Sequence, residues 1–143
     1  MKKEIIALTT TLLLAACGNG EKSVVFTKTC GLDAPSANSR MSVGKGFNVT
    51  GWAFDKYSTV TPTKVRVQFN FTEQSKTKTF DAPLTIKRPD IATAFKDPKL
   101  ETTGFNVVIP ANSLESGKYE IKILQDRSDE IVTCGDGYFV VME

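Results

Sequence analysis

Three cysteines and the complete absence of histidine limit the chemistry available to this 143-residue chain. The thiols lie at Cys17, Cys30 and Cys134. Without histidine, the sequence excludes Ser-His-Asp and Cys-His nucleophile pairs and every metal site that uses imidazole. A glycine-rich phosphate loop is missing, and the acidic residues between positions 126 and 136 lack the spacing of a calcium-binding loop. We therefore expect a protein without catalytic activity, cofactor or bound metal.

The first cysteine, Cys17, ends a segment organised like a secretory signal. A lysine pair opens the chain, and the apolar run that follows is about a dozen residues, whereas a membrane span needs about 20. The LAAC motif at 14–17 resembles the lipobox of bacterial lipoproteins, in which the chain is cut before the cysteine and the thiol is acylated. The resemblance implies a signal peptide over 1–16, a lipidated tether over 17–22 and attachment to the outer membrane. The alternative is an ordinary signal peptide with an incidental cysteine.

The other two cysteines, Cys30 and Cys134, form an even pair in the oxidising compartment that a signal peptide implies. We predict a disulfide between them. Such a bridge closes a loop of about 105 residues, for which chain entropy gives a stabilisation of up to about 4.7 kcal/mol. Two free thiols, one of them reactive, are the alternative, although neither cysteine has a histidine or a CxxC motif beside it.

Aromatic residues in the segment WAFDKY, at 52–57, are the first candidates for a binding surface. In a strand, Trp52 and Phe54 share one face and Gly51 lies on the other. A core position is the ordinary interpretation for Trp52, and we favour it. The alternative exposes one or more rings of Trp52, Phe54 and Tyr57 as a platform for a sugar or for an apolar patch of a partner.

Basic residues in the middle third of the chain are a second candidate surface. A scatter of this kind is usually a solvated face, but converging loops would let Lys87 and Arg88 contact anionic glycans or lipid headgroups. Arg88 and Asp90 flank Pro89, and we expect a structural corner there, with the arginine paired to a carboxylate or a carbonyl. The net charge of +2 gives no general attraction to nucleic acid. The basic residues are Lys76, Lys78, Lys87, Arg88, Lys96 and Lys99.

Strands must position these residues, because apolar and polar side chains alternate along much of the chain. The alternation is clearest over 65–72. Glycine-rich and polar turns separate many short runs of this kind, which is typical of an antiparallel sandwich or barrel. We therefore predict one all-β domain over 23–143. The other predicted strands are 23–29, 47–54, 77–80, 84–87, 105–109, 119–123, 130–134 and 138–141.

One segment, 89–95, is predicted to be helical, because Pro89 suits a first helical position; we expect Pro98 to end it. Four motifs occur in order along the chain: GWAxD at 51–55, RPDI at 88–91, GF at 104–105 and LxxGKY at 114–119. Together they resemble a group of bacterial immunoglobulin-like β-sandwich modules, which are accessory domains of secreted or surface proteins. With the helix at 89–95, this resemblance implies an antiparallel immunoglobulin-like β-sandwich with one short helical turn.

These observations favour a membrane-anchored, non-catalytic binding module at the bacterial cell envelope, with a protein or a glycan as its partner. An inhibitor of a lytic enzyme or protease is an alternative, in which 90–103 is the candidate inserting loop. A catalytic domain with an unfamiliar carboxylate pair is another, and it needs two acidic groups converging in one pocket. The five residues 18–22 reach at most about 18 Å, so we expect the domain to lie close to its membrane.

Overall fold

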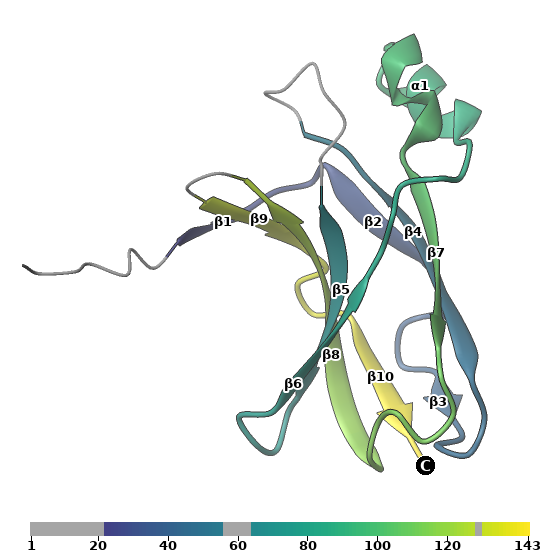
Figure 1. Ribbon diagram of the computed structural model, residues 1–143, viewed down its shortest axis with the longest axis vertical. Coiled ribbons are helices and arrows are strands. Elements are labelled where there is room, and N and C mark those ends of the chain that lie inside the picture. Colours follow the sequence, from purple (N-terminus) through teal and green to yellow (C-terminus); the bar gives the residue numbers. More distant parts are fainter. Residues whose placement is uncertain (1–21, 56–63, 128–129) are drawn as a thin grey trace, which may run out of the picture.

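The computed structural model describes residues 22–55, 64–127 and 130–143, and this part of the chain is all-β apart from two short helical segments. Two sheets face each other across a common core (Figure 1). The predicted signal segment with Cys17, and Tyr57, lie outside the described residues. No helix within the described ranges is long and apolar enough to cross a membrane.

The larger sheet is built around one long central strand. Its strands are β1 (Ser23–Phe26), β3 (Arg40–Met41), β5 (Val65–Phe71), β6 (Thr77–Asp81), β8 (Gly117–Asp126), β9 (Glu130–Cys134) and β10 (Phe139–Met142). One edge of β8 pairs with β5, which also pairs with β6; the other edge pairs first with β10 and then with β9. These pairs are antiparallel, as predicted, whereas β1 lies parallel to β9 and β3 lies parallel to β10.

The smaller sheet has three antiparallel strands, in the order β2 (Cys30–Ala34), β4 (Phe47–Ala53) and β7 (Gly104–Ile109). Buried and less buried residues alternate along β4, so Val49 and Gly51 face the core and Trp52 faces outward. A register shift between Leu32 and Ala34 marks an irregularity in β2. The candidate site lies on the outer face of the smaller sheet, the face that carries Trp52.

A disulfide joins the two sheets. Cys30 on β2 and Cys134 on β9 are bonded, with their Cα atoms 6.0 Å apart, and both side chains are buried. The predicted bridge is therefore confirmed, and neither residue is a free thiol. The core around it is apolar, as expected for the facing sides of two sheets. Its largest fully buried apolar side chains are Phe69, Phe105, Ile109, Ile121 and Ile123.

Three details of the strand prediction are wrong. Neither β2 nor β3 was predicted as a separate strand. β2 contains glycine and aspartate, which are poor strand formers, and β3 is only two residues long. The run at 84–87 is not a strand, since only Ile86 forms an isolated bridge, with Gly104.

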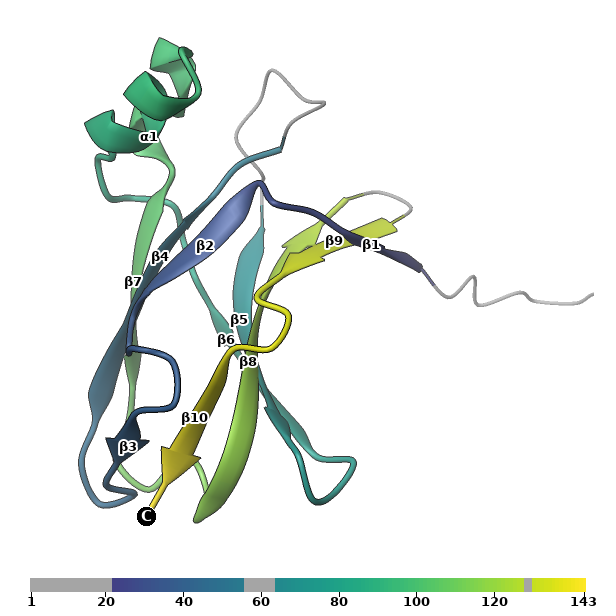
Figure 2. The same ribbon diagram turned by 180° about the vertical axis from the view of Figure 1, so that it is seen from behind.

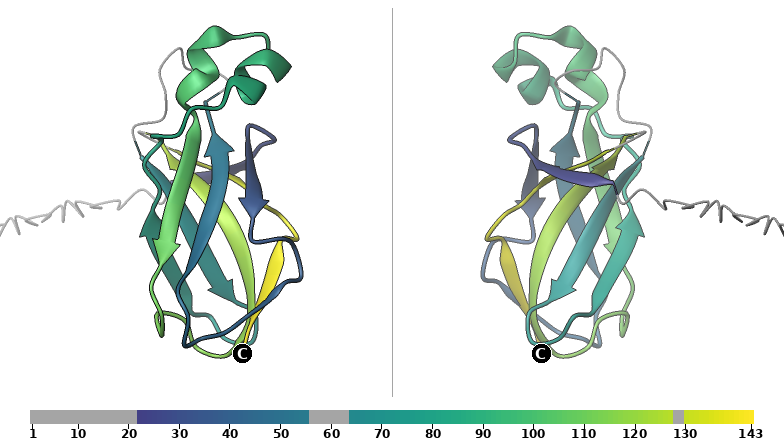
Figure 3. Two further views of the ribbon diagram at one scale, coloured as in Figure 1. Left: turned by 90° about the vertical axis from the view of Figure 1, so that its right-hand side faces the viewer. Right: turned by 90° about the vertical axis from the view of Figure 1, so that its left-hand side faces the viewer.

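Two helical segments form a cap beside the end of the smaller sheet, seen above its strands in Figure 3. The first, α1 (Pro89–Ala94), confirms the predicted helix. The second, η1 (Pro98–Thr102), corrects the expectation that Pro98 ends helical structure: Pro98 stands in the first turn of this 3₁₀ helix, where its missing N–H costs nothing. We call residues 89–102 the helical cap.

Candidate functional site

Three aromatic rings meet where the outer face of the smaller sheet contacts the helical cap. Trp52 stacks on Phe54 with ring centroids 5.9 Å apart, and Phe95, from the end of α1, lies 5.8 Å from Trp52 and 4.7 Å from Phe54. Phe54 is buried, Trp52 is partly buried and Phe95 is 46% exposed. We call Trp52, Phe54 and Phe95 the aromatic platform.

Glycines make room for the indole on this outer face. Gly31 on β2 lies opposite Trp52, and a Cβ there would come within 2.8 Å of the indole Nε1. On the core side, a Cβ at Gly51 would lie 2.3 Å from the carbonyl oxygen of Gly31. The favoured prediction of a core position for Trp52 is therefore wrong. The predicted alternation of faces along this strand is correct. Gly51, however, is the residue that faces the core, and the Trp52 ring lies on the outer face over the neighbouring strand β2.

Arg88 fastens the helical cap to the sheet. Its Nε and Nη2 donate to the two carboxylate oxygens of Asp90 at 2.9 and 2.7 Å, and Nη1 donates to Asp33 at 2.6 Å. The hydrogen bond from Arg88 lowers the pKa of Asp90 to about 2. The same hydrogen bond is the main reason why the pKa of Arg88 is raised. A Cβ at Gly104 would lie 2.8 Å from the Arg88 Cγ, so the arginine stem packs over β7. The predicted structural corner is confirmed.

The C-terminus of α1 sets the position of Phe95. Lys96 follows it with φ +54°, its N–H donates to the Thr93 carbonyl at 3.2 Å, and the N–H of Asp97 donates to the Ala92 carbonyl at 2.9 Å. This pair of bonds is a Schellman motif, in which glycine is the usual left-handed residue. Phe95 therefore stands at a defined helix end rather than on an irregular loop.

The basic residues do not converge on one surface. Lys87 is exposed beside the helical cap and pairs with Glu101 at 3.5 Å. Lys76 pairs with Glu115 at 3.3 Å, and Lys78 donates to the Ser113 carbonyl at 2.8 Å. Lys76 and Lys78 belong to the β5–β6 hairpin, which lies at the other end of the molecule from the cap (Figure 1). Lys76 and Lys78 are therefore not part of a joint cationic surface with the others. The remaining four basic residues lie on or beside the helical cap, and binding of an anion by Lys87 and Arg88 stays a prediction.

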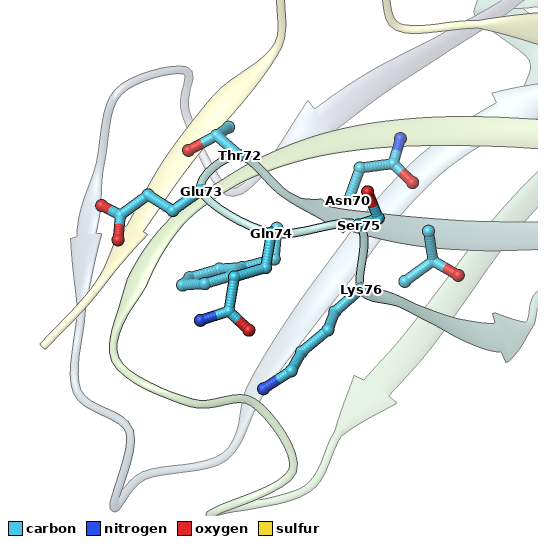
Figure 4. Close-up of a pocket in the computed structure, with 8 residues that line it drawn as sticks. Asn70, Thr72, Glu73, Gln74, Ser75 and Lys76 are labelled. Carbon is cyan, nitrogen blue, oxygen red and sulfur yellow. The ribbon is translucent and has the colours of Figure 1, made fainter.

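Three depressions of the described surface are each lined by a single acidic residue: Glu73, Asp136 or Glu115. One of about 460 Å³ is lined only by consecutive residues 70–77, so it is the inner side of the β5–β6 turn (Figure 4). Of the acidic residues considered for a cation, Asp126 pairs with Arg66 at 2.7 Å and Glu130 pairs with Arg127. Within the described residues, no group of three or more Cys, Asp or Glu side chains is placed to hold a metal.

Comparison with known proteins bears on the fold of this chain. No protein-family model and no curated protein matches this sequence. Among solved structures, the endo-β-1,4-mannanase from Thermotoga petrophila is similar, with a TM-score of 0.51 and 14% sequence identity. The likeness covers 80% of this chain and 19% of that chain. At this identity it bears on the fold alone, and this chain spans about a fifth of the enzyme.

Of the predicted binding residues, the structure brings Trp52 and Phe54 together, and it places Arg88 beside them as a fastening. Lys87 lies nearby on its own ion pair, and Tyr57 is outside the described residues. Sequence reasoning missed Phe95, because it lies about 40 residues away on the cap. The sequence shows only an aromatic residue at the end of a helix that begins with proline, and the contacts with Trp52 and Phe54 come from the structure.

Proposed function

We propose that this protein is a lipid-anchored, non-catalytic binding module of the bacterial cell envelope, and that the aromatic platform is its binding surface. One observation carries the proposal: Phe95 contacts two other rings and is still 46% exposed. A ring that is held in place and open to solvent loses little conformational freedom when a partner covers it. Its partner is an envelope protein or a glycan, both of which offer apolar surface to an aromatic face.

Lys96 supports this assignment. A left-handed conformation costs an ordinary L-residue about 1 to 2 kcal/mol, and glycine avoids that cost. Residues kept in such conformations cluster at functional sites. Lys96 is adjacent to Phe95, so we assign its ammonium group to the rim of the binding surface, where a polar contact fixes the orientation of a partner.

The anchor and the compartment have separate support. The LAAC motif places a cysteine, Cys17, where bacterial lipoproteins are acylated, and the Cys30–Cys134 bridge suits an oxidising compartment. Gly18 supports attachment to the outer membrane, because many lipoproteins that stay in the inner membrane have an aspartate at this position. The disulfide between facing sheets also supports an immunoglobulin-like β-sandwich as the finer fold assignment.

An inhibitor of a lytic enzyme or protease is the second candidate. The observation in its favour is the helical cap, which projects beyond the strands of the smaller sheet and carries Phe95 (Figures 1 and 3). A projecting segment of this kind suits insertion into a cleft. The two candidates differ in the partner, because an inhibitor's partner is an enzyme whose activity falls when the complex forms.

The test of the binding surface uses the full-length protein, purified in detergent, and envelope fractions that contain membrane proteins or cell-wall glycan. We expect Phe95→Ala to weaken retention by about tenfold, as for a central contact residue. Lys96→Gly should weaken retention while keeping the fold, because glycine suits φ +54°. The matched control is Val108→Ala, which changes a 65% exposed residue on the same sheet outside the platform. Equal retention of all these variants would contradict the proposal.

The anchor is tested separately with a radiolabelled fatty-acid precursor in growing cells. We expect the label in the wild-type protein and none in the Cys17→Ala variant, because only the thiol at position 17 lies in the LAAC motif. Both proteins are quantified by immunoblot to correct for expression. Equal labelling of the two would show that Cys17 is not the acylation site.

A further inference from the structure

Strand β1 is apolar and lacks cover. Val24, Val25 and Phe26 are 56%, 42% and 64% exposed, and no residue of β1 is buried. Neighbouring side chains of a strand face opposite sides, so both sides of β1 are open to solvent, and Phe26 borders a depression that also contains Cys30 and Cys134. An exposed apolar edge strand of this kind promotes association unless something covers it.

The open edge of β1 adds to this surface. β1 is the end strand of the larger sheet, and it pairs on one side with β9 and on the other with no strand in the described part of the chain. Figures 1 and 2 show β1 and β9 projecting sideways from the body of the sandwich, away from the helical cap. The surface of β1 is therefore accessible without any movement of the core.

Basic residues frame the apolar strand. Lys22 comes directly before it and donates a hydrogen bond to the Arg127 carbonyl oxygen at 2.6 Å, and Lys28 follows it; both lysines are exposed. The ammonium group of Lys122 lies 5.7 Å from the Phe26 ring centroid. Apolar side chains framed by lysine are the composition of segments that lie in the headgroup region of a bilayer, where the rings and aliphatic groups enter and the ammonium groups meet phosphate.

We infer that β1 docks on the phospholipid surface of the membrane that carries the lipid anchor. This inference rests on the acylation of Cys17 proposed above. Only residues 18–22 separate Cys17 from β1, and five residues reach at most about 18 Å. The anchor thus holds β1 beside the lipid at a high effective concentration, so a small patch is sufficient for docking.

Docking through β1 orients the domain. The aromatic platform lies on the outer face of the smaller sheet, whereas β1 belongs to the larger sheet and lies on the other side of the molecule in Figure 1. With β1 on the lipid, the helical cap that carries Phe95 lies away from the bilayer, toward soluble or cell-wall partners. The two exposed phenylalanines therefore contact different phases.

The test places a single indole at each of two positions in the full-length, acylated protein. Trp52 is the chain's one tryptophan, so Trp52→Phe gives a silent background for Phe26→Trp or, as a matched control, Val108→Trp. Each protein is reconstituted in vesicles of phosphatidylethanolamine and phosphatidylglycerol with brominated acyl chains, and vesicle flotation is measured on the same samples. We expect the bromines to lower the emission at position 26 about twofold or more, because interfacial segments enter about 5 to 10 Å, and to leave position 108 unchanged.

Three results would overturn the inference, and they are distinguishable. Flotation of the protein without quenching at position 26 would show that the lipid anchor attaches the protein but that β1 does not dock on the bilayer. Failure of the wild-type protein to float with the vesicles would contradict both the lipid anchor and the docking of β1, which rests on it. A separate crosslinking measurement on the same samples covers the remaining occupant. A crosslink from position 26 to a second copy of this chain, without bromine quenching, would show that β1 binds another copy and not lipid.

Discussion

Phe95 and Phe26 are both exposed phenylalanines, but the molecule holds them in different ways. Phe95 stands at a helix end and contacts Trp52 and Phe54, over a sheet row in which glycines make room for the rings. Phe26 lies on an end strand with no buried residue, and the Lys122 ammonium group lies 5.7 Å from the centroid of its ring. Phe95 belongs to a cluster of three aromatic rings, whereas no contact with another aromatic ring is found for Phe26 among the described residues.

The difference separates two kinds of exposure. A ring fixed by other rings presents one defined shape, which suits a partner that is recognised by its shape. An apolar strand without side-chain packing presents a soft apolar surface, which suits a fluid lipid layer. Exposure alone does not distinguish the two, whereas the contacts behind each ring do.

The largest expected effect comes from cutting the covalent link between the two regions. The Cys30–Cys134 bridge ties β2, beside the platform, to β9, which carries β1, across a sequence separation of 104. We expect Cys30→Ala/Cys134→Ala to lower the free energy of unfolding by about 2 to 5 kcal/mol. Denaturant unfolding of both proteins without reductant measures the loss. A double variant as stable as wild type would mean that the bridge is not a structural constraint.

A smaller effect distinguishes the two regions directly. We expect Trp52→Ala to cost about 2 kcal/mol, below the 3 to 5 kcal/mol typical of a core ring, because the indole is only partly buried. Phe26→Ala should change stability by no more than about 0.5 kcal/mol, because its side chain is 64% exposed. Thermal unfolding of the two variants tests the contrast, and equal losses would mean that β1 packs as firmly as the platform.

Features that depend on neighbouring residues could be predicted from the sequence, whereas features that depend on tertiary contacts could not. Strand alternation identified most strands and placed Trp52 and Gly51 on opposite faces, because both depend on neighbours in sequence. The favoured core position of Trp52 failed, because the side that carries the core depends on packing between sheets. Phe95 and Asp33 join the site through tertiary contacts, which no local pattern encodes.

The smallest expected effect concerns the fastening of the helical cap. The pKa of Asp90 is about 2 in the folded protein, below its ordinary value of 3.8, chiefly because Arg88 donates hydrogen bonds to it. A lowered carboxyl pKa stabilises the fold above pH 3.8 and loses that contribution as the pH falls toward 2.

We therefore expect Arg88→Gln to flatten the dependence of unfolding free energy on pH between about 4 and 2, with a larger difference at low salt because Asp90 is exposed. Unfolding curves of wild type and variant across this range measure the slope. Identical slopes would show that the Arg88–Asp90 pair contributes nothing to the fold.

The most direct test of the binding surface is site-specific photocrosslinking in living cells, with a photoreactive phenylalanine placed at position 95 or at position 26 of the full-length protein. We predict a discrete adduct with an envelope protein or glycan from position 95, and phospholipid adducts without that partner from position 26. The same partner captured equally from both positions, or no adduct from position 95, would contradict the assignment of the aromatic platform as the binding surface.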